Sequence, residues 1–215
     1  MLFLHNTSRV DDEPYPKLLQ EKGFGGFPSL CFMDADGNVV VRQSARTVEA
    51  FTTNAARLKS LFELRAKVAS LRADASKSAD VAKLERDLLF VEMDLQCVAA
   101  QDAKERAAKL ELGKDDLAAL EQYLFGAEIR DLRGKVRELG QEETSNRIAA
   151  MAKAGKSPPK DQEAFFWQMT LTWAAKNGDG ELGQRAFDVL DKQPAPESMK
   201  NRLRTMLEQS KGGSK

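Results

Sequence analysis

The sequence GFPSLCFMDADGNVVV, residues 26–41, is the strongest indication of a β-structure in the N-terminal part of the chain. Two apolar runs, Ser29 to Met33 and Asn38 to Arg42, flank the turn Asp34-Ala35-Asp36-Gly37. Short apolar runs joined by an Asp/Gly turn are typical of a β-hairpin. The first run is apolar on both faces, which predicts an interior strand. The second ends in polar residues, which predicts an edge strand.

The residues before this hairpin predict one more strand and a short helix. Met1 to His5 has the composition of a short buried strand, and a polar loop carrying Asp11-Asp12-Glu13 follows it. Pro16 suits a first helical position, and Gly23 is placed to end that helix. After the hairpin, Thr47 is the predicted N-cap of the next helix.

From there to the C-terminus the pattern is helical, and we expect no further strand. Leucine and valine recur at heptad spacing in two stretches, Leu61, Leu64, Val68 and Leu71, then Leu84, Leu88, Val91, Leu95 and Val98. The phase slips between Asp74 and Asp80, where serines cluster. The slip favours an antiparallel helical hairpin, about 47–73 and 80–112, over one long helix.

Beyond residue 112 the sequence predicts further helices. One is expected from Asp115 or Asp116 to about Leu139, and Lys153 to Lys160 has the glycine and prolines of a linker. Three short helices are expected at 162–176, 180–192 and 196–209. The predicted organisation is therefore an α/β unit at 1–56, a helical hairpin or coiled-coil-like region at 57–154, a short helical bundle at 160–210 and a tail at 211–215. Helices dominate overall.

Composition excludes several classes of function. Lysine plus arginine and aspartate plus glutamate number 33 each, so no basic field points to nucleic acid. No apolar stretch approaches the roughly 20 residues that a membrane-spanning helix needs. Cys31 and Cys97 are too far apart in sequence for a local CxxC pair or a metal cluster. We expect no cofactor and no metal, and without a signal peptide the chain as written is expected in the cytoplasm.

The order strand, short helix, Gly-Phe-Pro, hairpin, helix in residues 1–56 resembles the C-terminal half of a thioredoxin fold. The specific match is Gly26-Phe27-Pro28-Ser29 with the strand and turn that follow it. The resemblance implies a cis Phe27-Pro28 bond and places Phe27, Pro28 and Ser29 beside an extended protein segment. Ser29 stands where the family usually has threonine. Some bacterial thioredoxin-like proteins continue into a helical tail.

The half of the fold that carries the family's redox CxxC motif has no counterpart in the sequence. Dithiol exchange needs an accessible thiolate and a second thiol to resolve the mixed disulfide. The strand lacking a counterpart would lie between Met1 to His5 and Leu30 to Met33. A segment upstream in the natural protein or another chain could supply it, or the sheet could close without it. A start upstream would also allow a periplasmic or exported location.

For the other candidate residues, a structural role is the better interpretation than a functional one. Cys31 is a possible redox thiol, but its apolar neighbours favour a buried structural cysteine, as they do for Cys97. His5 has no evident partner for a metal. Phe165, Phe166, Trp167 and Trp173 form an aromatic group, for which helical spacing favours a packed core over a peptide groove. The turn Asn177-Gly178-Asp179-Gly180 is similar to that of tetratricopeptide-type helices, without a full repeat.

The leading hypothesis is a thioredoxin-like protein that lacks CxxC and serves as a protein-binding or scaffold module. The runner-up is a thiol–disulfide oxidoreductase whose CxxC lies upstream of the printed sequence. A third possibility is a structural homo-oligomer in which the heptad stretches pair between chains. All three imply a protein partner, with no nucleic acid and no membrane span.

Overall fold

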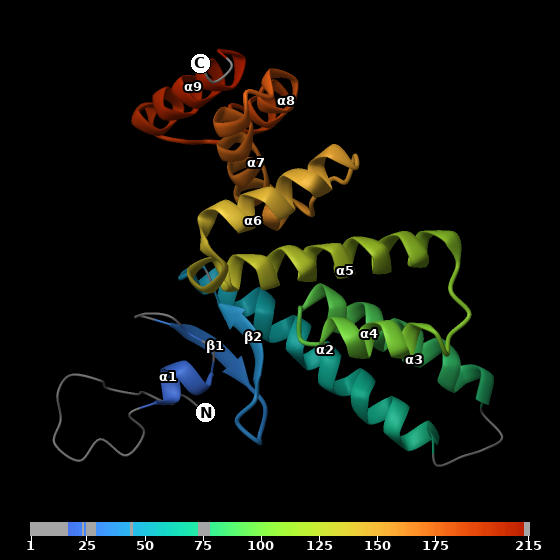
Figure 1. The fold of residues 1–215 in the computed structure, drawn as a ribbon. Coiled ribbons are helices and arrows are strands. Elements are labelled where there is room, and N and C mark those ends of the chain that lie inside the picture. Colours follow the sequence, from blue (N-terminus) through green and yellow to red (C-terminus); the bar gives the residue numbers. More distant parts are fainter. Residues whose placement is uncertain (1–16, 23, 25–28, 44, 73–77, 213–215) are drawn as a thin grey trace, which may run out of the picture. The chain divides into compact units, whose positions relative to one another are not determined.

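The computed structural model describes residues 17–22, 24, 29–43, 45–72 and 78–212 (Figure 1). These residues are dominated by helices and contain one small antiparallel sheet of two strands. The chain divides into two compact units, Met1–Leu110 and Glu111–Lys215. The prediction of a helix-dominated chain with an N-terminal hairpin is confirmed, and the thioredoxin-like character of that hairpin stays a prediction.

Several predicted features lie outside the described residues. These are the strand at 1–5 with His5, the acidic loop, the helix start at Pro16, the Phe27-Pro28 bond and the last residues of the tail. The short helix before the hairpin, α1, spans Leu18–Glu21. Lys22 ties it to the hairpin, because its Nζ donates to the Gly37 carbonyl at 2.6 Å.

The hairpin consists of β1, Leu30–Met33, and β2, Val39–Gln43, in antiparallel register with Cys31 opposite Arg42. The Asp34 carboxylate closes the turn by accepting hydrogen bonds from the backbone N–H groups of Asp36 and Asn38, at 3.0 and 2.8 Å. Gly37 has a φ of 78°. This left-handed conformation explains why the turn ends in glycine.

A long helix, α2, spans Val48–Arg72 and starts where the sequence predicts, since the Thr47 side chain accepts a hydrogen bond from the Ala50 N–H at 3.2 Å. The helix attaches to the hairpin through an aromatic contact between Phe32 and Phe51, whose ring centroids are 5.7 Å apart. A polar contact adds to it, because Asn54 donates to the buried Gln43 side chain at 2.6 Å.

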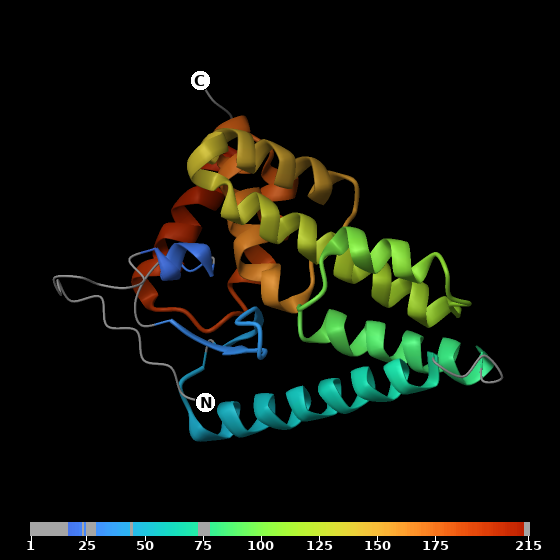
Figure 2. The same ribbon diagram turned by 90° about the horizontal axis from the view of Figure 1, so that it is seen from below.

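The next helix, α3, spans Ser78–Asp94 and packs along α2 (Figures 1 and 2). Two ion pairs join the helices, Arg57 with Asp94 and Arg72 with Glu85. A residue early in α2 thus pairs with the end of α3, and the end of α2 pairs with an earlier residue of α3, which shows that the two helices run antiparallel. The buried residues of this core come from both heptad stretches, from Leu58 of α2 and from β2, namely Val40, Val41, Leu58, Leu61, Val68, Leu88 and Leu95.

The predicted second arm of this hairpin, 80–112, is two helices rather than one. After α3 ends, Gln96 adopts a φ of 56°, and α4 begins at Ala100 and runs to Ala107. The N–H groups of Gln96 and Cys97 bond back to the carbonyls of Met93 and Glu92, both at 3.0 Å. This is a Schellman motif with glutamine in the position that glycine usually takes.

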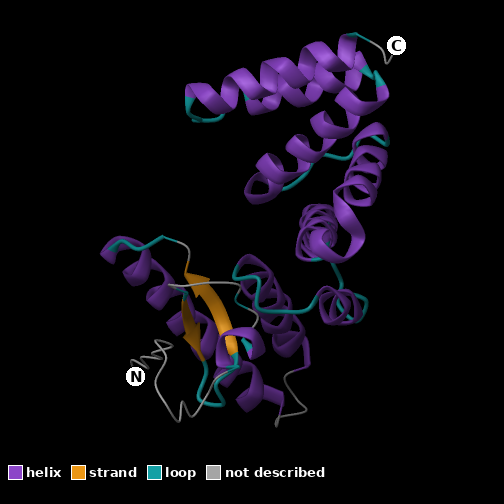
Figure 3. Cartoon of the chain, turned by 60° about the vertical axis from the view of Figure 1, so that its left-hand side comes forward, coloured by secondary structure: helices purple, strands orange, loops and turns teal. Residues whose placement is uncertain are grey.

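The second unit contains α5 (Lys114–Gly134), α6 (Val136–Lys153), the 3-10 turn η2 (Lys160–Gln162), α7 (Glu163–Asn177), α8 (Gly180–Leu190) and α9 (Glu197–Lys211). Its described residues include no strand (Figure 3). The helix expected to end at Leu139 ends earlier, and α6 follows, with a φ of 82° at Gly140 that interrupts its first turns. Residues 140–152, which the sequence placed within the helical region 57–154 without predicting a separate helix there, form most of α6.

The aromatic group of α7 lies in the core of this unit, as its helical spacing predicts. Phe166 and Trp167 are buried, with ring centroids 5.0 Å apart, and Phe125 of α5 packs edge-on against Phe166. The predicted break before α8 is also present. Gly178 has a φ of 68°, and the Asp179 carboxylate caps α8 by accepting from the Leu182 N–H at 3.1 Å.

Candidate functional site

A buried carboxylate, Glu92, is the centre of a polar cluster that joins three helices of the first unit. It lies on α3 within the otherwise apolar run Leu88-Leu89-Phe90-Val91-Glu92-Met93, so helical periodicity turns it toward the α2–α3 contact. Its side chain is only 6% exposed. A carboxylate at that depth needs charged or hydrogen-bonding partners to offset the loss of water.

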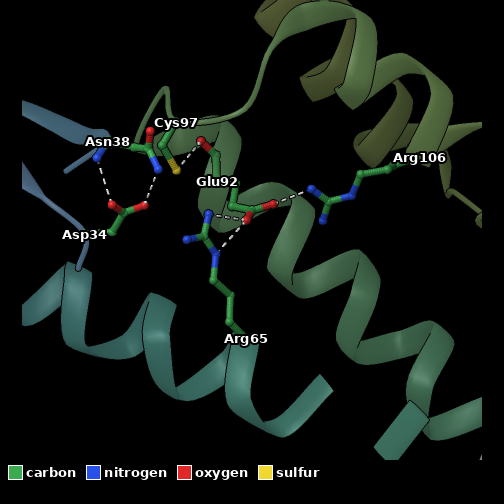
Figure 4. Close-up of polar contacts among 6 residues, drawn as sticks. All are labelled: Asp34, Asn38, Arg65, Glu92, Cys97 and Arg106. Atoms are coloured by element: carbon green, nitrogen blue, oxygen red, sulfur yellow. Dashed lines mark hydrogen bonds and ion pairs between the residues drawn. The ribbon is translucent and has the colours of Figure 1, made fainter. Parts of the chain in front are cut away.

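Two arginines from different helices supply those partners (Figure 4). Arg65 of α2 donates from Nε and Nη2 to Oε1 of Glu92, at 3.0 and 2.7 Å. Arg106 of α4 donates from Nη1 to the other oxygen, Oε2. Glu92 therefore joins α2, α3 and α4, and we call these three residues the arginine–glutamate bridge. One negative charge faces two positive charges, so the bridge carries a net positive charge.

Cys97 lies beside the bridge because the turn after α3 folds back on the helix. Its Sγ is 3.6 Å from the Glu92 carbonyl oxygen. Burial raises the pKa of the Cys97 thiol, and the nearby Glu92 carboxylate raises it further, while Arg65 and Arg106 lower it to a smaller extent. The group is thus a protonated thiol at neutral pH, and it is a poor nucleophile.

Two cavities flank the bridge, and Arg65, Glu92 and Arg106 line both. One, of about 380 Å³, extends toward Cys97, toward Asp102 and Glu105 of α4, and toward Lys109, which follows that helix. The other, of about 350 Å³, extends along α2 and α3 between Arg72 and the apolar side chains of Val68 and Leu88. The bridge thus separates a cavity of mixed charge from one that is basic and apolar.

The site predicted from the sequence lies at the hairpin, and the structure describes part of it. Ser29 precedes β1 and is half-buried, whereas Phe27 and Pro28 lie outside the described residues. Cys31 is half-buried within β1, and its thiol is not in a disulfide. Burial raises the pKa of the Cys31 thiol, and this outweighs the opposing effect of Arg42 and Lys22.

The arginine–glutamate bridge was missed by sequence reasoning. Its residues lie 27 and 14 positions apart along the chain, so no local motif contains them. One signal was present, since a lone glutamate stands inside an apolar helical run. Such a residue is either an unpaired charge that destabilises the buried face of the helix or the partner of a cation from another helix.

Among the described residues, no group of three histidine, cysteine, aspartate or glutamate side chains is arranged to hold a metal ion. The same part of the chain has no helix of the length and hydrophobicity needed to cross a bilayer. The sequence matches no family model, and no curated protein or solved structure is significantly similar to it.

Proposed function

We propose that the chain is a redox-inactive, thioredoxin-like protein-binding or scaffold module that holds an extended segment of a protein partner along β1. One observation carries the proposal. β1 is hydrogen-bonded to β2 on one side, and no other described strand pairs with it. A strand edge presents backbone N–H and C=O groups that an added strand can pair with.

The side chains of β1 suit such a role. Leu30, Cys31 and Phe32 are only partly buried, and Met33 is 39% exposed. An added strand would bury these apolar groups further while its backbone completes the hydrogen bonds of the edge. The hairpin itself is held firmly, because Phe32 packs on Phe51 and Gln43 bonds to Asn54.

The thiols support binding rather than dithiol exchange. Both cysteines have a raised pKa, so neither is a ready thiolate at neutral pH. Cys31 and Cys97 are also free rather than paired. The runner-up activity, thiol–disulfide exchange, needs a CxxC pair that the printed sequence does not contain.

The heptad residues argue for a scaffold within one chain over pairing between chains. Leu61 and Val68 of α2 lie in one buried core with Leu88 and Leu95 of α3. Pairing these faces with a second copy would require α2 and α3 to separate first. The packed α2–α3 hairpin instead supports β1 through the contact between Phe32 and Phe51.

The test uses an array of synthetic extended peptides of about eight residues, with the full chain as the probe. Peptides that bind are resynthesised with methyl groups on alternate backbone nitrogens. Binding along β1 predicts that one alternate set of methyl groups abolishes binding and the other does not, because only every second N–H of a strand faces its neighbour.

Two matched variants locate the binding surface. Met33→Lys places a charge on β1, and Met199→Lys places the same charge on α9, where the methionine is equally exposed at 39%. We expect Met33→Lys to weaken peptide binding by about fivefold or more and Met199→Lys to leave it unchanged. Equal effects, insensitivity to N-methylation or catalytic insulin reduction by this chain would each refute the proposal.

A further inference from the structure

We propose that the cavity between Arg65, Arg72 and Leu88 is a binding site for a small organic monoanion with an apolar body, such as a monocarboxylate. The inference rests on the arginine–glutamate bridge and is independent of the function proposed for β1. Both features lie in the first unit, but they involve different side chains, so either can fail without the other.

The bridge fixes two guanidinium groups at the cavity before any ligand arrives. Glu92 accepts from two nitrogens of Arg65 and one of Arg106. Each guanidinium has five N–H donors, so both retain donors for a second acceptor. The two arginine side chains are 37% and 35% exposed, which leaves those donors within reach of solvent. A ligand would meet an ordered pair of arginines, which reduces the entropy lost on binding.

The charge of the bridge sets the charge of the ligand. Two arginines share one buried carboxylate, so the bridge, counted by itself, has one positive charge in excess. Arg72, at the far end of the cavity, is paired with Glu85 at 2.7 Å. A monoanion therefore balances the bridge, whereas a dianion would bring one negative charge more than the bridge can neutralise. Guanidinium groups bind carboxylates and phosphates through paired N–H donors.

The residues that line the cavity determine the uncharged part of the ligand. Ala69 is exposed and forms the main apolar part of the lining, whereas Val68 and Leu88 belong to the core and reach the cavity with only 3% and 7% of their surface exposed. The cavity has a volume of about 350 Å³ and is open to solvent, so it has room for a small molecule of which one side stays in water. An alkyl or aryl group placed against these residues would remove mainly its own apolar surface from water while its carboxylate meets the arginines.

The cavity on the other side of the bridge is a poorer anion site. Asp102 and Glu105 line it together with Lys109, and their carboxylates repel an incoming anion. Because both cavities share the bridge, this difference in lining is what assigns the anion to the side of Val68 and Leu88.

The first experiment compares three probes on the full chain by calorimetry and by the NMR signals of the arginine Nε–H groups. The probes are hexanoate, its neutral analogue hexanamide, and inorganic phosphate. We expect saturable hexanoate binding with a Kd near or below about 1 mM, and binding at least about tenfold weaker for hexanamide and for phosphate. The Arg65 and Arg106 signals should move with hexanoate.

This comparison needs no variant, so it does not depend on a mutant that folds. Equal binding of hexanamide would overturn the role of the arginines, and equal binding of phosphate would overturn that of the apolar lining. Non-saturable hexanoate binding would overturn the site altogether.

A second experiment uses matched variants. Arg65→Gln removes one arm of the bridge. Arg57→Gln removes another α2 arginine that also pairs with α3, is 38% exposed and lines neither cavity. With circular dichroism confirming the fold, Arg65→Gln should weaken hexanoate binding about tenfold or more, and Arg57→Gln should not change it. Equal weakening in both variants would show non-specific attraction and overturn the assignment.

Discussion

The two units hold their helices together by different means. The core of the first unit is aliphatic, and beside it the buried carboxylate of Glu92 joins three helices through arginines. The core of the second unit adds three buried aromatic rings, Phe125, Phe166 and Trp167, to its aliphatic side chains. Packing that depends on a charge bridge is sensitive to loss of a partner, whereas packing that depends on ring volume is sensitive to cavities and overpacking.

The chain offers a way to follow the units separately. Both tryptophans, Trp167 and Trp173, lie in the second unit, and the first unit has none. Tryptophan fluorescence therefore reports unfolding of the second unit, while far-UV circular dichroism reports helices of both. A substitution confined to one unit should move the two signals differently.

The largest effect is expected from Phe166→Ala in the second unit. Phe166 is fully buried and contacts both Phe125 and Trp167, so its removal leaves a cavity among large side chains. We expect a loss of roughly 3–5 kcal/mol in the free energy of unfolding. Denaturant unfolding followed by tryptophan fluorescence measures it. Phe62→Ala, at an exposed position of α2, is the control and should leave that transition in place.

The next largest effect tests the charge bridge. Glu92→Ala removes the acceptor shared by Arg65 and Arg106, whose positive charges then face each other beside an apolar core. Since both arginines keep access to water, we expect a loss of roughly 2–3 kcal/mol rather than the full cost of an isolated buried charge. The circular dichroism transition should move while tryptophan fluorescence does not. A loss that appears first in fluorescence would contradict the division into separately stabilised units.

The third largest effect on stability is expected at a close contact between α8 and α9. A Cβ added at Gly183 of α8 would lie 2.3 Å from Ser210 Oγ and 2.8 Å from Ser210 Cβ, on α9. We expect Gly183→Ala to destabilise the second unit by roughly 1–3 kcal/mol, as overpacking does. The double variant Gly183→Ala, Ser210→Gly should recover part of that loss. Gly134→Ala on α5, where nothing lies within 4 Å, is the matched control and should stabilise slightly.

The features that sequence predicted well are those encoded by neighbouring residues. The hairpin turn requires Asp34 to reach N–H groups two and four positions ahead, and Thr47 caps a helix three positions ahead. The break at Gly178 likewise depends on one glycine with a positive φ. Such short-range hydrogen bonds and backbone preferences are visible in the sequence itself.

The features that were missed depend on tertiary contacts or on an atypical residue. Gln96 ends α3 in a conformation that usually signals glycine, so no residue type marked the break. Residues 140–152 form most of α6, and Ile148 and Ala149 pack into the core of the second unit. The sequence of this segment is only weakly amphipathic, so its pattern did not predict a helix. Glu92 joins residues from three helices, and only the folded chain brings them together.

A smaller, stabilising effect is expected from a substitution at Gln96 in the first unit. Gln96 has a φ of 56°, which costs a residue with a side chain roughly 1 kcal/mol relative to glycine. We expect Gln96→Gly to raise the stability of the first unit by roughly 0.5–1 kcal/mol. Gln101→Gly, within α4, is the matched control and should lower it by a similar amount. A loss of stability in both variants would mean that the side chain of Gln96 outweighs its backbone strain.

The smallest effects concern one carboxylate in each unit. Backbone hydrogen bonding from Asn38 lowers the pKa of Asp34, and the bond from Lys153 lowers the pKa of Asp179. A carboxylate with a lowered pKa contributes stability above its unfolded pKa of about 4 and loses that contribution as the pH falls through its folded pKa. Both contributions should therefore be intact at neutral pH and vanish only in acid.

The two carboxylates can be told apart because Asp179 lies close to a tryptophan of its own unit, whereas the first unit contains no tryptophan. Lys153 Nζ is 2.9 Å from the Asp179 carboxylate and 4.1 Å from the centre of the Trp173 ring, so protonation of Asp179 should change the fluorescence of that ring. We expect an acid fluorescence step below pH about 4 that Asp179→Asn removes and Asp34→Asn leaves unchanged. Asparagine still caps a helix, so Asp179→Asn isolates the charge. A step that survives Asp179→Asn would mean that acid acts on the second unit through another carboxylate.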